Sequence, residues 1–428
     1  MSDIKISVVV PVLNTVNYIQ ECLESIRHQT LKEIEVICVD GGSTDGSLKV
    51  QQQYAVMDSR FSVVTDVYRS YGKQVNRGIE LAQGKYVGIV EPDDYIDADM
   101  YENLYQVAEH NNAEMVRADY YSFIGEGEKK SIFPRAIVAE RLYNRNISIK
   151  DCQEIFNYGP PNWNGIYRKD FLTKNNIRHN ETPGASFQDL GFAFLTLAMA
   201  HEVCFIQQKG YFYRLDNSNS SVKKSDKMAY IFEEFRYVER KLTDAGLYYI
   251  YSLELFKQKV IHYKWGFYRT ADSEKEFFWK KANLDVQKTW NDILECNIEV
   301  SCNERKTIEQ LLNEMECLYA QYLDNKKQFN CLMEAKVPWL LFGCGTDGIN
   351  FLLMMKEQMT NMHAILDNNQ RLQGLNILNK RVLEVKEGVR KYPDAFYIIA
   401  SAKYAHEMKN QLLELGIETD KILIQRMV

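Results

Sequence analysis

Runs that read as buried strands alternate with runs that read as helices, and this alternation constrains the fold more than any other feature. Ile6–Val12 is a continuous apolar, β-branched run, typical of a strand buried on both faces. A helical apolar spacing follows over Tyr18–Gln29, and Glu35–Val39 is a second buried run. Such alternation favours an α/β domain with a mainly parallel sheet. The further expected elements are strands at Phe61–Thr65, Tyr86–Val90 and Glu114–Tyr121 and helices at Lys73–Ala82 and Met100–Asn111.

The length predicts more than one domain. A chain of 428 residues exceeds the roughly 250–300 residues at which a single core stops growing. We expect a catalytic domain over residues 1–224, a helical linking region over 225–335 and a small Rossmann-like α/β domain over 336–428. The helical region has almost no Gly or Pro and carries apolar residues at helical spacing. Its expected helices are Ala229–Leu242, Leu253–Tyr268, Glu276–Trp290 and Arg305–Leu323.

A glycine-rich turn marks the last region. Trp339–Phe342 reads as a strand, and Gly343, Gly345 and Gly348 after it fit the G-x-G-x-x-G pattern that opens dinucleotide-binding units. Asp367 lies 22 residues after Gly345, a suitable spacing for a ribose hydroxyl contact. The segment is short for a full dehydrogenase. We therefore expect a Rossmann-like unit and leave open whether it binds a nucleotide or serves assembly or partner docking.

Charge and cysteine usage narrow the classes of function. The chain carries 52 Lys and Arg against 58 Asp and Glu, a net charge of −6, whereas general nucleic-acid binders show a basic excess. It has no run of about 18 apolar residues that would predict a transmembrane helix. The nine cysteines form no Cys-x-x-Cys pair, which favours reduced thiols over a disulfide framework or a zinc site. We expect no nucleic-acid partner and a cytoplasmic location, and we leave peripheral membrane contact open.

Two acidic loops follow predicted strands, where parallel sheets bind their ligands. Glu91, Asp93 and Asp94 place three carboxyls within four residues. Hard divalent cations take such oxygen ligands, and Mg²⁺ usually shares its shell with substrate phosphates. The alternative is that Asp94 only caps the next helix. The second loop runs from Asp40 to Gly46, and its glycines allow a ligand to approach the backbone closely.

Taken together, these loops resemble the family 2 glycosyltransferases with the GT-A fold. The resemblance covers about residues 4–220, and its motifs are specific for the family but not for the sugar. Leu13, Gly41 and Glu91 depart from the family pattern, which often has Tyr or Asp at these positions. The matching motifs are Val8-Val9-Val10-Pro11-Val12-Leu13-Asn14, Asp40-Gly41-Gly42-Ser43-Thr44-Asp45-Gly46-Ser47, Asn76-Arg77-Gly78 and Glu91-Pro92-Asp93-Asp94.

The resemblance implies a site for a nucleotide-diphospho-sugar, most often a UDP-sugar. Asp40 would contact the uracil or ribose. Glu91 and Asp93 match the family's D-x-D motif, and Asp93, with Glu91, would bind Mn²⁺ or Mg²⁺. The residues expected to bind the nucleotide-sugar are Pro11, Val12, Asn14, Asp40, Gly42, Asn76, Glu91, Pro92, Asp93 and Arg214.

The resemblance also implies residues on the acceptor side. Asp189 matches the family's catalytic base, with Gln188 in place of the usual Glu, and the alternative is that Asp189 caps a helix. Trp163 and Gln188 are expected to contact the acceptor, Trp163 either as an exposed stacking ring or as a buried wall. Arg214 belongs to a stretch, residues 209–227, with five Lys and Arg against two Asp, which would attract a departing diphosphate.

These features predict an inverting, metal-dependent glycosyltransferase that makes a surface polysaccharide or glycoconjugate. Its partners would be a nucleotide-diphospho-sugar donor and a glycan, glycolipid or glycoprotein acceptor, and a homo-oligomer through the helical or C-terminal region stays open. Two alternatives remain. One is a non-catalytic sugar-nucleotide-binding or scaffold protein, and the other is a nicotinamide-dependent enzyme that uses the C-terminal glycine motif. The donor sugar, the acceptor and the linkage do not follow from the sequence.

Overall fold

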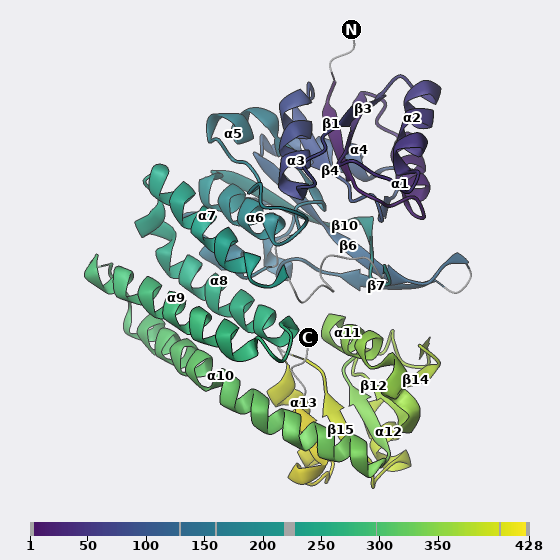
Figure 1. Cartoon of the computed structure of the whole chain (residues 1–428), viewed down its shortest axis with the longest axis vertical. Helices are drawn as coiled ribbons and strands as arrows, with labels where there is room; N and C mark the ends of the chain where they lie inside the picture. Colours follow the sequence, from purple (N-terminus) through teal and green to yellow (C-terminus); the bar gives the residue numbers. More distant parts are fainter. Residues whose placement is uncertain are drawn as a thin grey trace. The chain divides into compact units, whose positions relative to one another are not determined.

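The computed structural model describes residues 4–127, 130–158, 161–217, 227–296, 298–401 and 404–424 (Figure 1). Contacts divide the chain into two compact units. The first contains Met1–Lys259 and Thr289–Ile298, and the second contains Val260–Lys288 and Glu299–Val428. This division falls within two helices, so it follows packing rather than sequence order. The three-domain division expected from the sequence remains a prediction.

The first unit is built on a ten-stranded sheet whose main path runs β3-β2-β1-β4-β9-β6-β10-β5. β1, β2, β3 and β4 pair in parallel, and β9 is antiparallel to both β4 and β6. Because β10 is parallel to β6, six strands point the same way, which confirms the mainly parallel sheet. The strands are β1 Ile6–Val12, β2 Ile34–Asp40, β3 Phe61–Thr65, β4 Tyr86–Ile89, β5 Tyr95–Ile96, β6 Met115–Ile124, β7 Ser131–Arg135, β8 Asn146–Ser148, β9 Gly165–Arg168 and β10 Glu202–Arg214.

Apolar spacing explains why the helices of this unit form where they do. α1 (Ile19–Arg27) buries Ile19, Cys22, Leu23 and Ile26, one face of a 3.6-residue period, against the core. β1 buries all seven of its residues, as its unbroken apolar run predicted. The other α-helices are α2 Ser47–Met57, α3 Tyr71–Leu81, α4 Met100–Asn111, α5 Lys169–Lys174, α6 Gln188–Met199 and α7 Tyr230–Asp244, with α8 Tyr248–Arg269 shared between the units.

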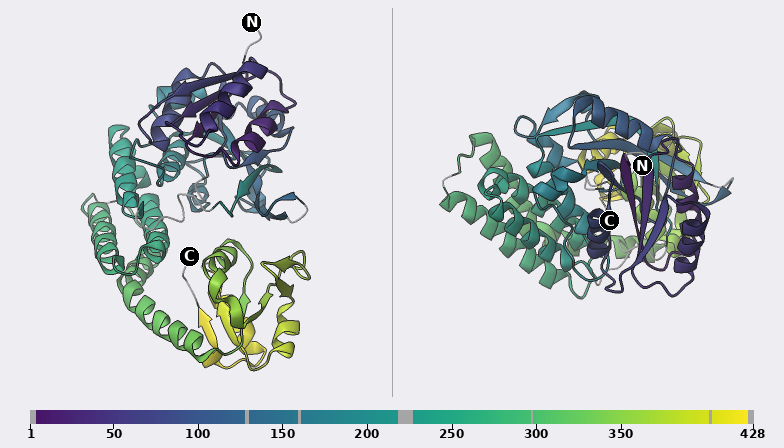
Figure 2. Two further views of the ribbon diagram at one scale, coloured as in Figure 1. Left: turned by 45° about the vertical axis from the view of Figure 1, so that its right-hand side comes forward. Right: turned by 90° about the horizontal axis from the view of Figure 1, so that it is seen from above.

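The second unit contains a smaller sheet in the order β13-β14-β12-β11-β15-β16. β14, β12, β11, β15 and β16 are parallel, and β13 is antiparallel to β14. The long helix α10 (Cys302–Ala335) leads into this sheet and contacts β16 (Figure 2). The strands are β11 Trp339–Phe342, β12 Met362–Leu366, β13 Asn376–Ile377, β14 Lys380–Leu383, β15 Phe396–Ile399 and β16 Ile422–Ile424, and the remaining α-helices are α9 Lys275–Glu295, α11 Thr346–Met354, α12 Val385–Lys391 and α13 Ala405–Glu414.

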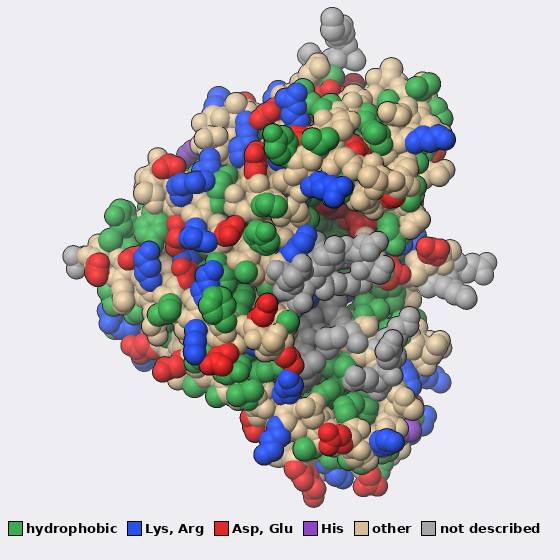
Figure 3. Space-filling model, viewed as in Figure 1, with side chains coloured by type: hydrophobic (Ala, Val, Ile, Leu, Met, Phe, Trp, Pro, Cys, Tyr) green, Lys and Arg blue, Asp and Glu red, His purple; other side chains and the backbone are tan. Residues whose placement is uncertain are grey.

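The expected elements are confirmed, with ends that shift by a few residues. The main difference is α10, whose helix extends 12 residues beyond the expected end at Leu323. A Ser301–Glu304 capping box fixes its start. No helix within the described residues is long and apolar enough to cross a membrane. On the face shown in Figure 3, acidic and basic side chains are interspersed.

Candidate active site

The acidic loop Glu91–Asp94 lies after β4 and is fastened to β10. Asp94 is buried, its Oδ2 accepts a hydrogen bond from the Tyr211 hydroxyl at 2.8 Å, and its Oδ1 accepts from the Arg214 backbone N–H at 2.8 Å. The Tyr211 hydroxyl in turn accepts from the Glu91 backbone N–H at 3.0 Å. Asp94 therefore holds the loop in place, while Glu91 and Asp93 are residues of intermediate exposure.

Burial of these carboxyls makes their ionised forms costly. It raises the pKa of Glu91 to about 8, against the opposing effect of a hydrogen bond that the Tyr71 hydroxyl donates to Oε1 at 2.6 Å. Burial also raises the pKa of Asp93, whose Oδ2 accepts a hydrogen bond from Asn217 at 2.7 Å. The pKa of Asp94 lies well above its ordinary value, through burial and the charge of Asp93. A cation at this loop would offset the crowded negative charge.

The side chains at this loop suit a Mg²⁺ or Mn²⁺ ion whose coordination is shared between the protein and the donor's diphosphate. Glu91 and Asp93 supply hard oxygen donors whose charge no described lysine or arginine side chain neutralises by an ion pair. Within the described residues, no group of three or more His, Cys, Asp or Glu side chains is arranged to hold a metal ion. The protein would therefore contribute part of the coordination, and diphosphate oxygens and water would complete it.

Asp40 ends β2 at the same edge of the sheet, but its carboxyl is turned into its own loop. It is fully buried, and Oδ1 accepts hydrogen bonds from the backbone N–H groups of Gly42 and Ser43 at 2.9 and 2.8 Å. Oδ2 accepts from the Gln51 amide at 2.7 Å. Asp40 therefore shapes the loop around Gly42, whose φ of 88° is left-handed. Its predicted contact with a nucleotide remains a prediction.

The other predicted nucleotide-binding residues also brace the loops. Asn14 accepts a hydrogen bond from the Thr44 backbone N–H at 2.8 Å and so links two loops. Asn76 is buried, and its amide bonds the backbone of His179 in both directions at 2.9 Å. The buried residues Pro11, Val12 and Pro92 lie at the ends of β1 and in the acidic loop. Nucleotide binding by these residues stays a prediction.

Asp189 lies in the first turn of α6, where the helix dipole favours negative charge. Its carboxyl is partly exposed, and Oδ1 accepts from the Leu190 backbone N–H at 2.9 Å. Burial raises the pKa of Asp189 to about 6. Tyr71 connects Asp189 to the acidic loop, because its hydroxyl donates to Glu91 and its backbone N–H donates to the Gly184 oxygen in the loop before α6. Such a carboxylate is suited to accept a proton near neutral pH.

Gln188 and Trp163 are both buried. The Gln188 amide donates to Thr182 Oγ1 at 2.8 Å, and its oxygen accepts from the Ser186 backbone N–H, so it fixes the loop before α6. Trp163 is only 7% exposed, and its ring stacks on Tyr211 and Tyr213 with centroids 4.2 and 5.2 Å apart. Of the two readings of Trp163, the structure shows the buried one. An acceptor contact by either residue stays a prediction.

Arg214 ends β10 and is committed to neighbouring groups. Its Nη2 donates to Glu21 at 2.7 Å, and its Nε donates to the Asp93 backbone oxygen at 3.0 Å. The guanidinium also lies over the ring of Tyr18, 4.7 Å from the centroid. Arg214 thus ties α1 to the acidic loop, and a role in diphosphate binding would require it to exchange partners. Lys223 and Lys224 of the basic stretch lie outside the described residues.

The C-terminal glycine motif adopts a compact strand–turn–helix. Gly343 has a φ of 105°, and a Cβ on Gly348 would lie 1.9 Å from the Gly343 oxygen, so both positions require glycine. No described atom lies within 4 Å of a Cβ on Gly345. Asp367 accepts hydrogen bonds from the backbone N–H groups of Cys344 and Asn369 at 2.6 and 2.7 Å. Its carboxyl thus holds the turn, and nucleotide binding here stays a prediction.

Four polar residues near the site had no signal in the sequence. Tyr71, Asn162 and His179 form a hydrogen-bonded chain that ends at Glu91. Glu234 of α7 is buried near Asp189, and burial raises its pKa to about 8. Because they come from separate segments, only the fold brings them together.

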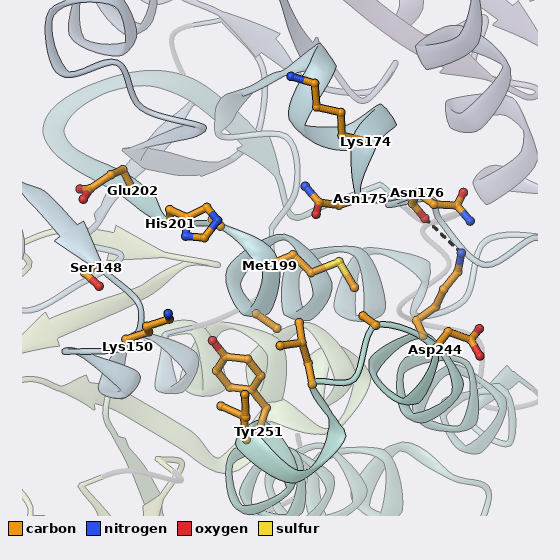
Figure 4. Close-up of a pocket in the computed structure, with 16 residues that line it drawn as sticks. Ser148, Lys150, Lys174, Asn175, Asn176, Met199, His201, Glu202, Asp244 and Tyr251 are labelled. Carbon is orange, nitrogen blue, oxygen red and sulfur yellow. Dashed lines mark hydrogen bonds between the residues drawn. The ribbon is translucent and has the colours of Figure 1, made fainter.

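A separate cavity of about 810 Å³ lies at the other end of α6 (Figure 4). Ala198, Met199 and Ala200 line it, and Lys241 donates to the Asn176 backbone oxygen at 3.0 Å beside it. Asp189 is ten residues away along α6, roughly 15 Å at 1.5 Å per residue. None of the acidic loop residues lines this cavity, so it is distinct from the candidate active site.

Comparisons with known proteins define the class of the first unit. The family model described as Glycosyl transferase family 2 matches residues 7–174. The model described as C2185-like, N-terminal, matches residues 333–423. The expectation of a family 2 glycosyltransferase domain is thereby confirmed for residues 7–174. For the C-terminal region, a second sheet domain is present, and its Rossmann-like character remains a prediction.

Individual relatives agree with this class. Glycosyltransferase GlyG of Streptococcus pneumoniae is 29% identical over 255 residues, which are 58% of this chain and 82% of GlyG. Uncharacterized glycosyltransferase EpsJ of Bacillus subtilis is 28% identical over 218 residues, which are 50% of this chain and 62% of EpsJ. The chain thus spans less than two thirds of the length of EpsJ.

A solved structure shows the same fold. The crystal structure of S. aureus TarS 1-349 in complex with UDP-GlcNAc aligns with a TM-score of 0.54 at 19% identity, covering 76% of this chain and 90% of that chain. At this identity the likeness establishes the fold, and it confirms the expected GT-A-like architecture.

Proposed function

We propose that this protein is an inverting, metal-dependent glycosyltransferase that moves a sugar from a UDP-sugar to a hydroxyl of a glycan, glycolipid or glycoprotein. The observation that carries the proposal is that Tyr71 joins the acidic loop to the loop before Asp189: its hydroxyl donates to Glu91 Oε1 at 2.6 Å, and its backbone N–H donates to the Gly184 oxygen at 2.9 Å. A family 2 glycosyltransferase match over the surrounding residues supports it, and so does the UDP-GlcNAc bound by a structural neighbour.

The chemistry divides between donor and acceptor groups. The acceptor oxygen forms a bond to the anomeric carbon of the donor, and the bond from that carbon to the diphosphate oxygen breaks. Asp189 takes the hydroxyl proton, and the nucleoside diphosphate leaves with the bonding electron pair. Mn²⁺ or Mg²⁺, when bound, would neutralise the charge that develops on the diphosphate. Asp93 and Glu91 are the protein groups that would hold the cation.

Titration calorimetry with UDP, in the presence and absence of Mn²⁺, tests the donor side. We expect metal-dependent binding in the natural chain and its loss, at least about tenfold in affinity, in Asp93→Ala, because a charged metal ligand is removed. Asp170→Ala is a matched control, because Asp170 lies in α5 with an exposed carboxyl that pairs only with surface groups of its own segment. Metal-independent UDP binding that Asp93→Ala leaves unchanged would contradict the proposal.

A screen of UDP-sugars for slow metal-dependent hydrolysis then identifies the donor. UDP binding without hydrolysis or transfer for any donor would favour a non-catalytic sugar-nucleotide-binding protein. NADH binding without UDP binding would favour an enzyme that uses the C-terminal glycine motif. A role in surface polysaccharide or glycoconjugate synthesis, a membrane-associated acceptor and a homo-oligomer are parts of the same proposal for later tests.

A further inference from the structure

Tyr71 contacts both halves of the candidate active site. Its hydroxyl donates to Glu91 Oε1 at 2.6 Å on the donor side. Its backbone N–H donates to the Gly184 oxygen at 2.9 Å, in the loop that leads to Asp189. Tyr71 is the first residue of α3, directly after the N-cap Ser70, whose side chain accepts from the Lys73 backbone N–H. The position of its backbone is therefore fixed by the start of that helix.

The loop before α6 is joined to this segment by backbone pairing. Gly184 forms a parallel bridge with Ser70, and its N–H donates to the Arg69 oxygen at 2.7 Å. The Gln188 amide donates to the Gly184 oxygen at 3.2 Å from within α6. The start of α3 and the start of α6 are thus connected through Gly184. A shift of Tyr71 would move the backbone on which Asp189 depends.

A second connection runs through side chains. Asn162 Nδ2 donates to the Tyr71 hydroxyl at 3.0 Å and lies 2.9 Å from His179 Nε2. The His179 ring stacks on Phe192 of α6, with centroids 4.0 Å apart and planes 9° apart. Asn162 and His179 are buried, so these contacts are shielded from water. The Tyr71 hydroxyl therefore has a fixed orientation, which it imposes on Glu91.

We propose that Tyr71 is a positioning residue, whose hydroxyl orients the Glu91 carboxyl for donor binding. Through its backbone bond to Gly184, Tyr71 also fixes the position of Glu91 relative to the loop before Asp189. The inference rests on the proposed function and adds a residue to it. A glutamate side chain has three rotatable bonds, and ordering a free one on ligand binding reduces affinity. The hydrogen bond from Tyr71 orders it before the donor arrives.

The test measures transfer kinetics of the full-length chain with the donor that the UDP-sugar screen identifies. In Tyr71→Phe we expect the donor KM to rise about tenfold, the loss typical of one hydrogen bond to a charged group, with kcat within about twofold. Phenylalanine keeps the ring and its edge contact with His179 but leaves the Asn162 amide with one partner fewer, so the melting midpoint should fall only modestly and the chain should stay folded in the assay. Tyr68→Phe is the matched control. Tyr68 lies three residues before Tyr71, is 70% exposed and contacts Lys73 with the face of its ring.

A double-mutant cycle separates positioning from a general structural role. In Glu91→Asp the carboxyl is one methylene shorter and loses the Tyr71 hydroxyl, so adding Tyr71→Phe should cause no further rise in KM. Losses that multiply in the double variant, or a Tyr71→Phe enzyme with the same KM as Tyr68→Phe, would overturn this inference alone. A natural chain that neither binds UDP with Mn²⁺ nor transfers sugar would overturn the proposed function and this inference with it.

Discussion

Both sheets of this protein have acidic residues directly after a parallel strand, but the surroundings of their carboxyl groups differ. In the smaller sheet, Asp367 follows β12 and accepts two backbone hydrogen bonds from its own surroundings. In the larger sheet, Glu91 and Asp93 follow β4, and burial raises the pKa of both. Two backbone N–H groups stabilise the ionised form of Asp367, whereas burial makes the ionised forms of Glu91 and Asp93 costly despite one side-chain hydrogen bond to each.

The difference shows that an acid at a strand end is not by itself a functional signal. Asp40 supports this within the larger sheet, because its carboxyl is fully buried and bonded to Gly42, Ser43 and Gln51. Carboxyls whose hydrogen-bonding capacity is met by the local backbone build the loop, as caps and turns do. Carboxyls left with excess charge in a partly exposed position are the better candidates for ligand binding.

The largest expected effect comes from removing one carboxylate beside each sheet, Asp189 in α6 beside the larger sheet and Asp367 after β12 in the smaller one. Asp189→Asn should lower transfer by about 10²–10⁴-fold, because an amide cannot accept the acceptor proton. UDP binding should persist, since the donor side is intact. Turnover assays and UDP calorimetry check both parts, and Asp367→Asn is the control that should transfer at the normal rate. Near-normal turnover of Asp189→Asn would remove the base assignment.

The pH dependence of transfer tests the electrostatics of the larger sheet. Burial raises the pKa of Asp189 to about 6, so the ionised base is lost as the pH falls below that value. We expect kcat/KM to fall about tenfold per pH unit on the acid side. The same shift has the opposite effect on stability, because the folded state binds the proton more tightly between about pH 4 and pH 6, so stability from this group declines as pH rises through that window. A rate that is flat from pH 5 to pH 8 would contradict the assignment.

The smaller sheet should respond through stability rather than turnover. Asp367→Ala leaves the Cys344 and Asn369 backbone N–H groups without their carboxylate partner, so we expect a loss of about 1–3 kcal/mol. Denaturant unfolding followed by fluorescence, compared with transfer rates in native buffer, measures both effects. A marked loss of transfer with unchanged stability would assign the smaller sheet a direct part in the reaction.

The weakest expected effect is at Gly345 of the C-terminal turn, and Gly348 in the same turn is its contrast. Gly348→Ala should destabilise by about 1–3 kcal/mol, because its Cβ would overlap the Gly343 oxygen. Gly345→Ala should cost less than about 1 kcal/mol, because no described atom lies near its Cβ. Thermal melting compares the two. If the natural chain binds a nucleotide and Gly345→Ala abolishes that binding with little change in the melting midpoint, the turn is a nucleotide-binding site.

Much of the fold could be predicted from the sequence, because apolar periodicity is local. The run from Ile6 to Val12 and the spacing of Ile19, Cys22, Leu23 and Ile26 depend only on neighbouring residues, and the structure confirms both elements. The full length of α10 was missed, because its C-terminal half carries mostly exposed polar residues and only a sparse apolar pattern, with Phe329 and Leu332 buried.

The candidate site was predicted only in part. The strand ends predicted one shared edge for Asp40, Glu91 and Asp93, because parallel strands share their carboxyl ends, and the family resemblance alone proposed Asp189. It did not show that Arg214 pairs with Glu21, since these residues are far apart in the chain and meet only through packing. Nor did it find Tyr71, whose partners come from three other segments.

The sequence by itself determined the apolar strands β1 to β4, the helices with regular apolar spacing and the acids available at the strand ends, because these follow from residues close together in the chain. Only the tertiary structure decided which of those acids the protein satisfies. The Asp40 and Asp367 carboxyls accept hydrogen bonds from groups of their own loops, whereas Glu91, Asp93 and Asp189 are buried by elements distant in sequence. Burial and electrostatic crowding depend on all of those elements at once, which is why no local pattern contains them.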